Sequence, residues 1–168
     1  MTAPPVVGSR SRRIGLLAGV SAFVIAADQI TKSLAVSHLA DHRDHLFGPF
    51  YLALSYNSGV AFSLGTGLTL PIIIIVVCLV GSVAWFARGV VTTSGAVGFG
   101  MILGGAIGNL ADRLFRGHHG AVVDFLYSGF WPTFNVGDAC IVIGSAVVAI
   151  NYWRSGHHVA RPAEPSDA

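Results

Sequence analysis

Two aspartates stand in contrasting settings that suit acid–base chemistry. Asp124 lies within the apolar run Val-Val-Asp-Phe, which raises the pKa of a carboxyl group because burial disfavours its charged form. Asp138 stands directly before the uncharged stretch 139–153, where the dipole of a helix start would stabilise the carboxylate. One carboxyl group held neutral and one held charged can act as the acid and the base of a hydrolytic reaction. This pair is therefore the first candidate for catalysis.

Further polar residues gather next to the apolar stretches of the chain. Ionisable groups at membrane depth are costly, so they are usually paired and usually functional. Charges scattered by chance would occupy both faces of a membrane, whereas these come from separate parts of the chain to one face. They are Asp28, Gln29 and Lys32 after the first stretch, Asn109, Asp112 and Arg113 after the third, and Asn135 before the fourth.

Other catalytic chemistries have little support in the sequence. It contains neither the Gly-x-Ser-x-Gly motif of serine hydrolases nor the His-Glu-x-x-His motif of zinc peptidases. The histidine pairs at 118–119 and 157–158 lack partners at the spacing that metal ligands need. Cys78 and Cys140 each stand in an apolar run, where a cysteine acts as a small apolar side chain. We therefore expect no metal and no cofactor.

Long apolar stretches must position these groups. Hydrophobic residues make up 53% of the chain and charged residues only 11%, about half the charged share of a soluble domain. Four uncharged stretches stand out, at residues 14–27, 68–87, 89–111 and 139–153. As helices, the first and last span only about 21–23 Å of the roughly 30 Å of hydrocarbon, so both must continue past their aspartates. We predict a mainly α integral membrane protein with a four-transmembrane-helix bundle.

The basic residues predict the orientation in the membrane. With four crossings both termini share one side, which carries six arginines against four basic residues on the other. Both termini are then cytoplasmic, with residues 1–13 as a cytoplasmic segment, 14–154 as one membrane domain and 155–168 as a polar, disordered tail. A formal charge of +2 without a basic stripe speaks against nucleic-acid binding. Alternatively, the first stretch is a secretory signal peptide cleaved near Ala27.

The glycines of the third stretch predict close helix packing. Gly100, Gly104 and Gly108 recur at four-residue steps and form a smooth face for a neighbouring helix. Such packing would press Asn109 and Arg113 toward the first and fourth helices. Two other function classes stay open on the residues alone. A proton-coupled transporter would use the intramembrane charges as a relay, and a non-enzymatic scaffold would use them only to hold helix ends together.

Five motifs, in order and with compatible spacing, resemble those of the bacterial lipoprotein signal peptidases, also called signal peptidase II. Each motif alone is weak evidence, but the five together are highly specific. They are residues 28–32 (Asp-Gln-Ile-Thr-Lys), 57–62 (Asn-Ser-Gly-Val-Ala-Phe), 104–113 (Gly-Gly-Ala-Ile-Gly-Asn-Leu-Ala-Asp-Arg), 122–125 (Val-Val-Asp-Phe) and 134–138 (Phe-Asn-Val-Gly-Asp).

The resemblance implies an outward-facing aspartic site without metal, in a protein of the bacterial inner membrane. It implies cleavage of diacylglyceryl-modified prolipoproteins just before the lipid-bearing cysteine, by the pair Asp124 and Asp138. We expect a monomer whose partners are these substrates and membrane lipid. The matching positions that line or support the site are Asn57, Asn109, Arg113, Asn135, Asp28, Lys32 and Asp112.

The resemblance also implies a small extracytoplasmic β-sheet and loop at the membrane surface, within residues 46–62. The alternation of Phe50, Leu52 and Leu54 agrees with a strand that has one apolar face. Gly48 with the proline after it predicts a turn just before this strand. One departure is Gly137, where the family usually has alanine. Glycine there would loosen the start of the fourth helix without removing a functional group.

Overall fold

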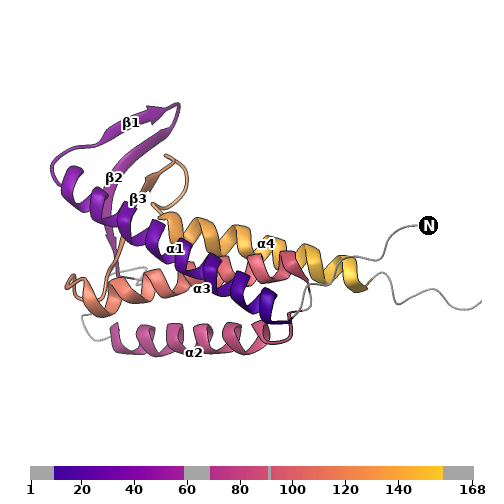
Figure 1. The fold of residues 1–168 in the computed structure, drawn as a ribbon. Coiled ribbons are helices and arrows are strands. Elements are labelled where there is room, and N and C mark those ends of the chain that lie inside the picture. The colour runs from indigo at the N-terminus through magenta and orange to yellow at the C-terminus, as the bar shows by residue number, and fades with distance from the viewer. Residues whose placement is uncertain (1–9, 59–68, 91, 157–168) are drawn as a thin grey trace, which may run out of the picture.

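The residues that the structure describes form four helices and a three-stranded sheet, shown in Figure 1. The computed structural model describes residues 10–58, 69–90 and 92–156, so most of the predicted terminal segments and residues 59–62 of the predicted sheet region lie outside the described residues. The elements, in chain order, are α1 (Arg10–His38), β1 (Asp44–Phe47), β2 (Phe50–Asn57), α2 (Thr69–Ala87), α3 (Thr93–Phe115), β3 (Val122–Tyr127) and α4 (Val136–Gly156).

The helices have the length and composition of membrane spans. Within the described residues, α1, α3 and α4 are each long and apolar enough to cross a membrane. Helix α2 has 19 residues, about 28 Å of helix, and its described apolar run Ile73–Ala87 is shorter. Large apolar side chains such as Phe23 and Val142 are 73% and 69% exposed, which fits contact with lipid. The predicted class, a mainly α membrane protein with a small sheet, is confirmed.

Helix α3 is the centre of the bundle and contacts each of the other three helices. Its glycines allow the close approach to α1. A Cβ atom at Gly100 would lie 2.9 Å from the carbonyl oxygen of Leu17, and one at Gly104 would lie 2.7 Å from the Cβ of Val24. Contacts this short leave no room for a side chain. The predicted packing role of the glycine face is therefore confirmed.

We predict that Gly104→Ala destabilises the bundle while Gly19→Ala does not. The new methyl group at position 104 would collide with α1, and overpacking of this kind typically costs about 1–3 kcal/mol. Nothing lies within 4 Å of a Cβ atom at Gly19, so this second substitution is the matched control in a helix. The unfolding temperature of the two variants in detergent measures the difference. Equal unfolding temperatures would contradict tight packing at Gly104.

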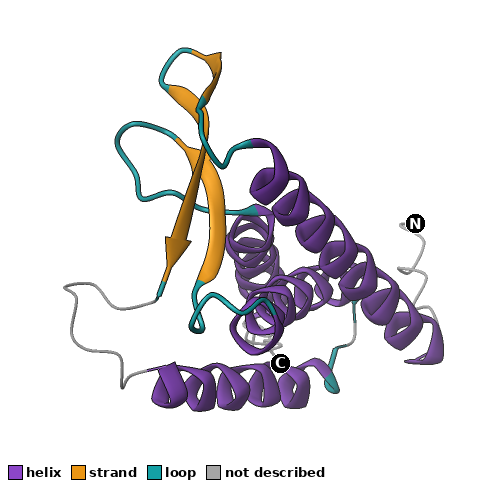
Figure 2. Ribbon diagram, turned by 90° about the vertical axis from the view of Figure 1, so that its left-hand side faces the viewer, coloured by secondary structure: helices purple, strands orange, loops and turns teal. Residues whose placement is uncertain are grey.

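The sheet stands at one end of the bundle, beyond the end of α1, as Figures 1 and 2 show. Its antiparallel order is β1-β2-β3, and the turn between β1 and β2 places Gly48 at a φ of 53°, as the sequence predicted for a turn there. Leu52 and Leu54 pack against a small core that includes Phe125, whereas Phe50 contacts Phe47 instead. The predicted strand is confirmed, and its expected apolar face holds for the two leucines only.

Two helix ends differ from the sequence expectation. The sequence predicts that Asp28 and Lys32 follow the apolar stretch 14–27, but α1 continues to His38, so both residues lie well inside the helix. The helix tolerates these charges because they are buried in pairs. Helix α3 begins at Thr93 instead of residue 89, because the Thr92 side chain caps it by accepting a hydrogen bond from the Gly95 amide.

Candidate active site

Asp124 is a buried carboxylate on the strand β3. Only 1% of its surface is exposed, and β3 pairs with β2 so that Asp124 lies opposite Ser55. Its Oδ2 accepts a hydrogen bond from the Asn57 side chain at 3.1 Å, and its Oδ1 accepts one from the Asn135 side chain at 2.7 Å. Asn57 ends β2 and Asn135 precedes α4, so two separate segments hold this carboxyl group.

Asp138 lies in the first turn of α4, where it forms a reciprocal cap with Asn135. The Asn135 side-chain oxygen accepts a hydrogen bond from the Asp138 amide at 2.8 Å, and Asp138 Oδ2 accepts one from the Asn135 amide at 3.2 Å. This is the geometry of a capping box, which satisfies two free amides at a helix start. Asp138 Oδ1 also accepts a hydrogen bond from the Asn109 side chain at 2.8 Å. These contacts fix the Asp138 side chain at the start of α4.

Asn135 therefore binds both aspartates at once and fixes them next to each other. Burial of Asp124 raises its pKa to about 6, and the negative charge of Asp138 pushes it in the same direction. The hydrogen bonds from Asn57 and Asn135 lower the pKa and oppose part of this effect. Thus one carboxyl group is shifted toward its neutral form beside another that is held by amide donors. This contrast is what an acid–base pair requires.

Lys32 is a buried lysine that is linked to the aspartate pair through Asn109. Lys32 Nζ is 2.7 Å from Asp28 Oδ2 and 3.0 Å from Asp112 Oδ2, and all three side chains have 0% exposure. We call these three residues the Lys32 cluster. Lys32 also donates a hydrogen bond of 2.7 Å to Asn109, which in turn donates to Asp138. Such buried charges are tolerated only when they are paired and hydrogen-bonded.

The two carboxylates of the Lys32 cluster position the backbone at the aspartate pair. Asp28 Oδ1 accepts a hydrogen bond of 2.8 Å from the amide of Gly137, the residue directly before Asp138. Asp112 Oδ2 accepts one of 3.1 Å from the amide of Val123, the residue directly before Asp124. Lys32 thus pairs with two carboxylates that each bind the backbone directly before one aspartate of the pair. These contacts also tie residue 28 into the site.

Arg113 is half-buried beside the same residues. Its guanidinium donates a hydrogen bond to the Asn109 carbonyl oxygen and attracts the carboxylates of Asp138 and Asp124. Its Nε is buried and has no hydrogen-bond partner among the described residues.

Arg116 and Gln29 also belong to the site. Gln29 is one of the polar residues that the sequence predicts at one face, whereas Arg116 is not among its candidates. Arg116 donates from Nε to Asp112 at 2.8 Å and from Nη2 to the Gln29 side chain at 2.8 Å. Gln29 also donates to Asp112 at 3.0 Å. The spacing of Asp112 and Arg116 on one helix face was a usable signal for this pair. The structure brings all nine predicted site residues into one network of contacts. Among the described residues, no three His, Cys, Asp or Glu side chains are arranged so that they could hold a metal ion.

Comparison with known proteins decides the family. A sequence profile described as "Signal peptidase (SPase) II" matches residues 20–154. The chain belongs to the signal peptidase II family. The protein is therefore a membrane protease, and the predicted removal of signal peptides from prolipoproteins is confirmed. This membership sets aside the transporter and scaffold alternatives.

Relatives and a solved structure agree with this membership. A lipoprotein signal peptidase of Mycobacterium leprae is 42% identical over 83% of this chain and 72% of its own length. Another, from Mycobacterium avium, is 44% identical over 83% of this chain and 79% of its own. A solved bacterial membrane enzyme has the same fold, with a TM-score of 0.75, 21% identity, and coverage of 89% of this chain and 94% of its own.

Proposed function

We propose that this signal peptidase II is an aspartic endopeptidase whose catalytic groups are Asp124 and Asp138. The observation that carries the proposal is the shared contact with Asn135, which holds Asp124, with its raised pKa, beside Asp138, which accepts hydrogen bonds from the Asn109 side chain and the Asn135 amide. Such a pair can activate water without a covalent intermediate. No step of the reaction that follows needs a metal ion.

The reaction assigns a separate task to each carboxyl group. Asp138 accepts a proton from a water molecule, which attacks the carbonyl carbon of the scissile peptide. Protonated Asp124 donates a hydrogen bond to the carbonyl oxygen as negative charge develops there, and the free Nε of Arg113 supplies a second donor on that side. The tetrahedral intermediate then collapses as a proton passes to the leaving amine, which gives a new carboxyl group and a new amino group.

The substrates would be prolipoproteins that already carry diacylglycerol on a cysteine, with cleavage just before that residue. The site suits them because it lies between membrane helices and the sheet, where a lipid-bearing peptide can stay in the bilayer while its peptide bond reaches the aspartates (Figure 1). In this proposal the site faces outward, both termini are cytoplasmic, and the enzyme acts as a monomer.

A synthetic prolipoprotein peptide tests this substrate assignment. The purified enzyme should cleave the peptide with a diacylglyceryl cysteine and release a product whose new N-terminus is that cysteine, as mass spectrometry can show. The same peptide with an unmodified cysteine is the matched control and should be cleaved far more slowly. Equal cleavage of both peptides would contradict recognition of the lipid.

The pKa of Asp124 predicts the pH dependence of cleavage. Because the proposed acid must be protonated, kcat/KM should fall as the pH rises through about 6, approaching tenfold per pH unit. The hydrogen bond from Asn57 lowers this pKa, so Asn57→Ala should move the fall in activity to a higher pH. A kcat/KM profile of both enzymes, with folding checked at each pH, measures the shift. A profile that is flat above pH 6 would exclude Asp124 as the acid.

A further inference from the structure

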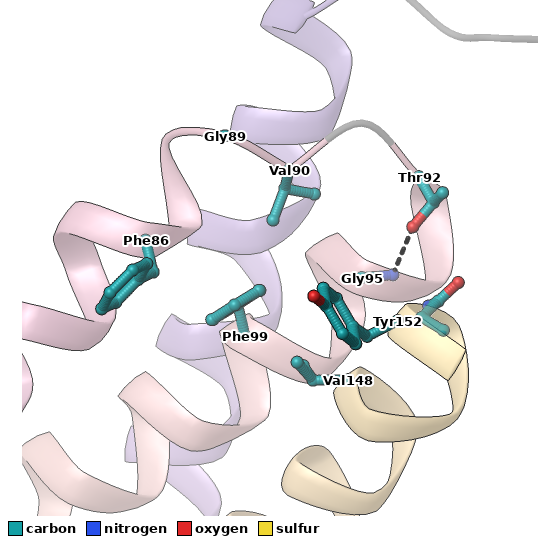
Figure 3. Close-up of a pocket in the computed structure, with 9 residues that line it drawn as sticks. Phe86, Gly89, Val90, Thr92, Gly95, Phe99, Val148 and Tyr152 are labelled. Atoms are coloured by element: carbon teal, nitrogen blue, oxygen red, sulfur yellow. Dashed lines mark hydrogen bonds between the residues drawn. The ribbon is translucent and has the colours of Figure 1, made fainter. Parts of the chain in front are cut away.

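An apolar groove lies at the end of the bundle away from the aspartate pair. Its volume is about 270 Å³, and its walls come from the end of α2, the start of α3 and the end of α4. Figure 3 shows Phe86, Val90 and Phe99 facing one another around the hollow, with Val148 and Tyr152 of α4 on its other side. The volume is below the roughly 300–1,000 Å³ of common small-molecule sites, so the groove fits a short apolar segment better than a compact ligand.

Two polar side chains on the groove wall already have partners in the protein. Thr92 accepts a hydrogen bond from the Gly95 amide at 3.0 Å, a contact drawn in Figure 3. Asn151 donates one of 2.6 Å to Ser94. A polar ligand would have to compete with these bonds, whereas an apolar chain would not. The groove therefore favours a hydrocarbon occupant.

The groove lies at a strongly basic end of the protein. Arg88 follows the last residues of α2 beside the groove, and Arg154 follows Tyr152 on α4. Both arginines are exposed. The carboxylates of the described residues lie instead in the site or around β1. The arginines at this end are Arg10, Arg12, Arg13, Arg88 and Arg154, and the described aspartates are Asp28, Asp41, Asp44, Asp112, Asp124 and Asp138.

Exposed tryptophans mark this end as a membrane boundary. Trp85 and Trp153 are 67% and 66% exposed, and the Arg88 guanidinium lies 5.0 Å from the centre of the Trp85 ring. Tryptophan and tyrosine gather where the hydrocarbon meets the lipid headgroups, and arginine there faces the phosphates. The groove thus lies beneath a headgroup layer that its own arginines can reach.

We propose that this groove binds an anionic phospholipid, which places part of one acyl chain against Phe86, Val90 and Phe99. The lipid phosphate lies at the surface against Arg88 and Arg154. Charge complementarity selects an anionic headgroup over a zwitterionic one, and the satisfied polar wall selects the acyl chain. The site is separate from the aspartate pair, so it concerns how the enzyme is held in its bilayer rather than how it cleaves.

Quenching of tryptophan fluorescence by lipids with brominated acyl chains tests this proposal. In a Trp131→Phe background, Trp85 and Trp153 report on the groove end, since the chain has three tryptophans. Brominated phosphatidylglycerol should quench them at about thirtyfold lower mole fraction than brominated phosphatidylcholine, the scale expected for two arginines beside an anionic headgroup. A Trp85→Phe/Trp153→Phe background, with Trp131 at the sheet as reporter, should show no such preference.

Two variants locate the lipid within this end of the protein. Arg88→Gln/Arg154→Gln should remove the preference for phosphatidylglycerol, and Val90→Phe, which fills the groove, should weaken quenching by it severalfold. Both should retain cleavage of the lipidated peptide, because neither touches the aspartate pair. Equal quenching by the two lipids would overturn the proposal. So would a preference that survives in Arg88→Gln/Arg154→Gln, or unchanged quenching in Val90→Phe.

Discussion

Replacing either aspartate of the pair with asparagine should abolish cleavage of a lipidated prolipoprotein peptide. Asparagine has nearly the same shape but neither accepts a proton from water nor donates one to a leaving group. Loss of an acid or a base typically lowers the rate by about 10²–10⁴-fold. We expect Asp124→Asn and Asp138→Asn each to lower the rate of cleavage by at least this factor. A single-turnover assay of peptide cleavage measures the loss.

The controls for this prediction separate catalysis from folding. Asp138→Asn keeps one oxygen for the cap at the start of α4, so the variant should stay folded, as its unfolding temperature can show. Asp41→Asn removes an exposed carboxylate elsewhere in the protein and should leave the rate unchanged. Normal cleavage by a folded Asp124→Asn or Asp138→Asn enzyme would refute the assignment of the catalytic pair.

Lys32→Met should cause a large loss of stability. The methionine fills a similar volume but leaves Asp28 without its cation and deprives Asp112 of one of two. Breaking a buried ion pair on one side costs about 3–5 kcal/mol, because the partner charge stays buried. The hydrogen bonds from the Gly137 and Val123 amides should loosen at the same time, so activity should fall with stability. Thermal unfolding in detergent measures the first effect.

Arg116→Gln is the matched control for this lysine. Arg116 also binds Asp112, but its side chain is 18% exposed, and Asp112 keeps its buried pair with Lys32 when Arg116 is replaced. Its unfolding temperature should therefore stay close to that of the unchanged protein. If the unfolding temperature of Lys32→Met is no lower than that of Arg116→Gln, the Lys32 cluster does not stabilise the site. A further substitution, Asp28→Asn in the Lys32→Met background, should recover part of the loss by removing the unpaired charge.

The place of Asp138 was predictable from the sequence, whereas the place of Asp124 was not. The fourth apolar stretch is too short to cross a membrane alone, so its helix had to include Asp138, and α4 does begin two residues earlier. Asp124 lies between the third and fourth apolar stretches, where the sequence gives no path for the chain, so its meeting with Asp138 rests on the family resemblance. The strand β3 was missed, although Val122–Tyr127 has the β-branched and aromatic residues that favour strands.

The hydrogen bonds from the Gly137 and Val123 amides to Asp28 and Asp112 could not be predicted from the sequence, for a physical reason. The carboxylate of Asp28 binds the amide of Gly137, 109 residues away, and an amide carries no residue identity that a pattern could reveal. Gly137 is also tightly packed, although a glycine at this position was expected to loosen the start of the fourth helix. A Cβ atom there would lie 3.0 Å from Asp28 Oδ1 and 3.1 Å from the Gly105 carbonyl oxygen. Only the packed structure shows that these backbones meet.

The buried charges of the site also bear on how the chain enters the bilayer. Asp28 and Lys32 are four residues apart on α1, and Asp112 and Arg116 are four apart on α3, so each helix carries its own neutralised pair. Moving a helix from water into lipid costs less free energy when its acidic and basic side chains are paired than when it carries a lone charge. The cross-link from Lys32 to Asp112 forms only when the two helices meet.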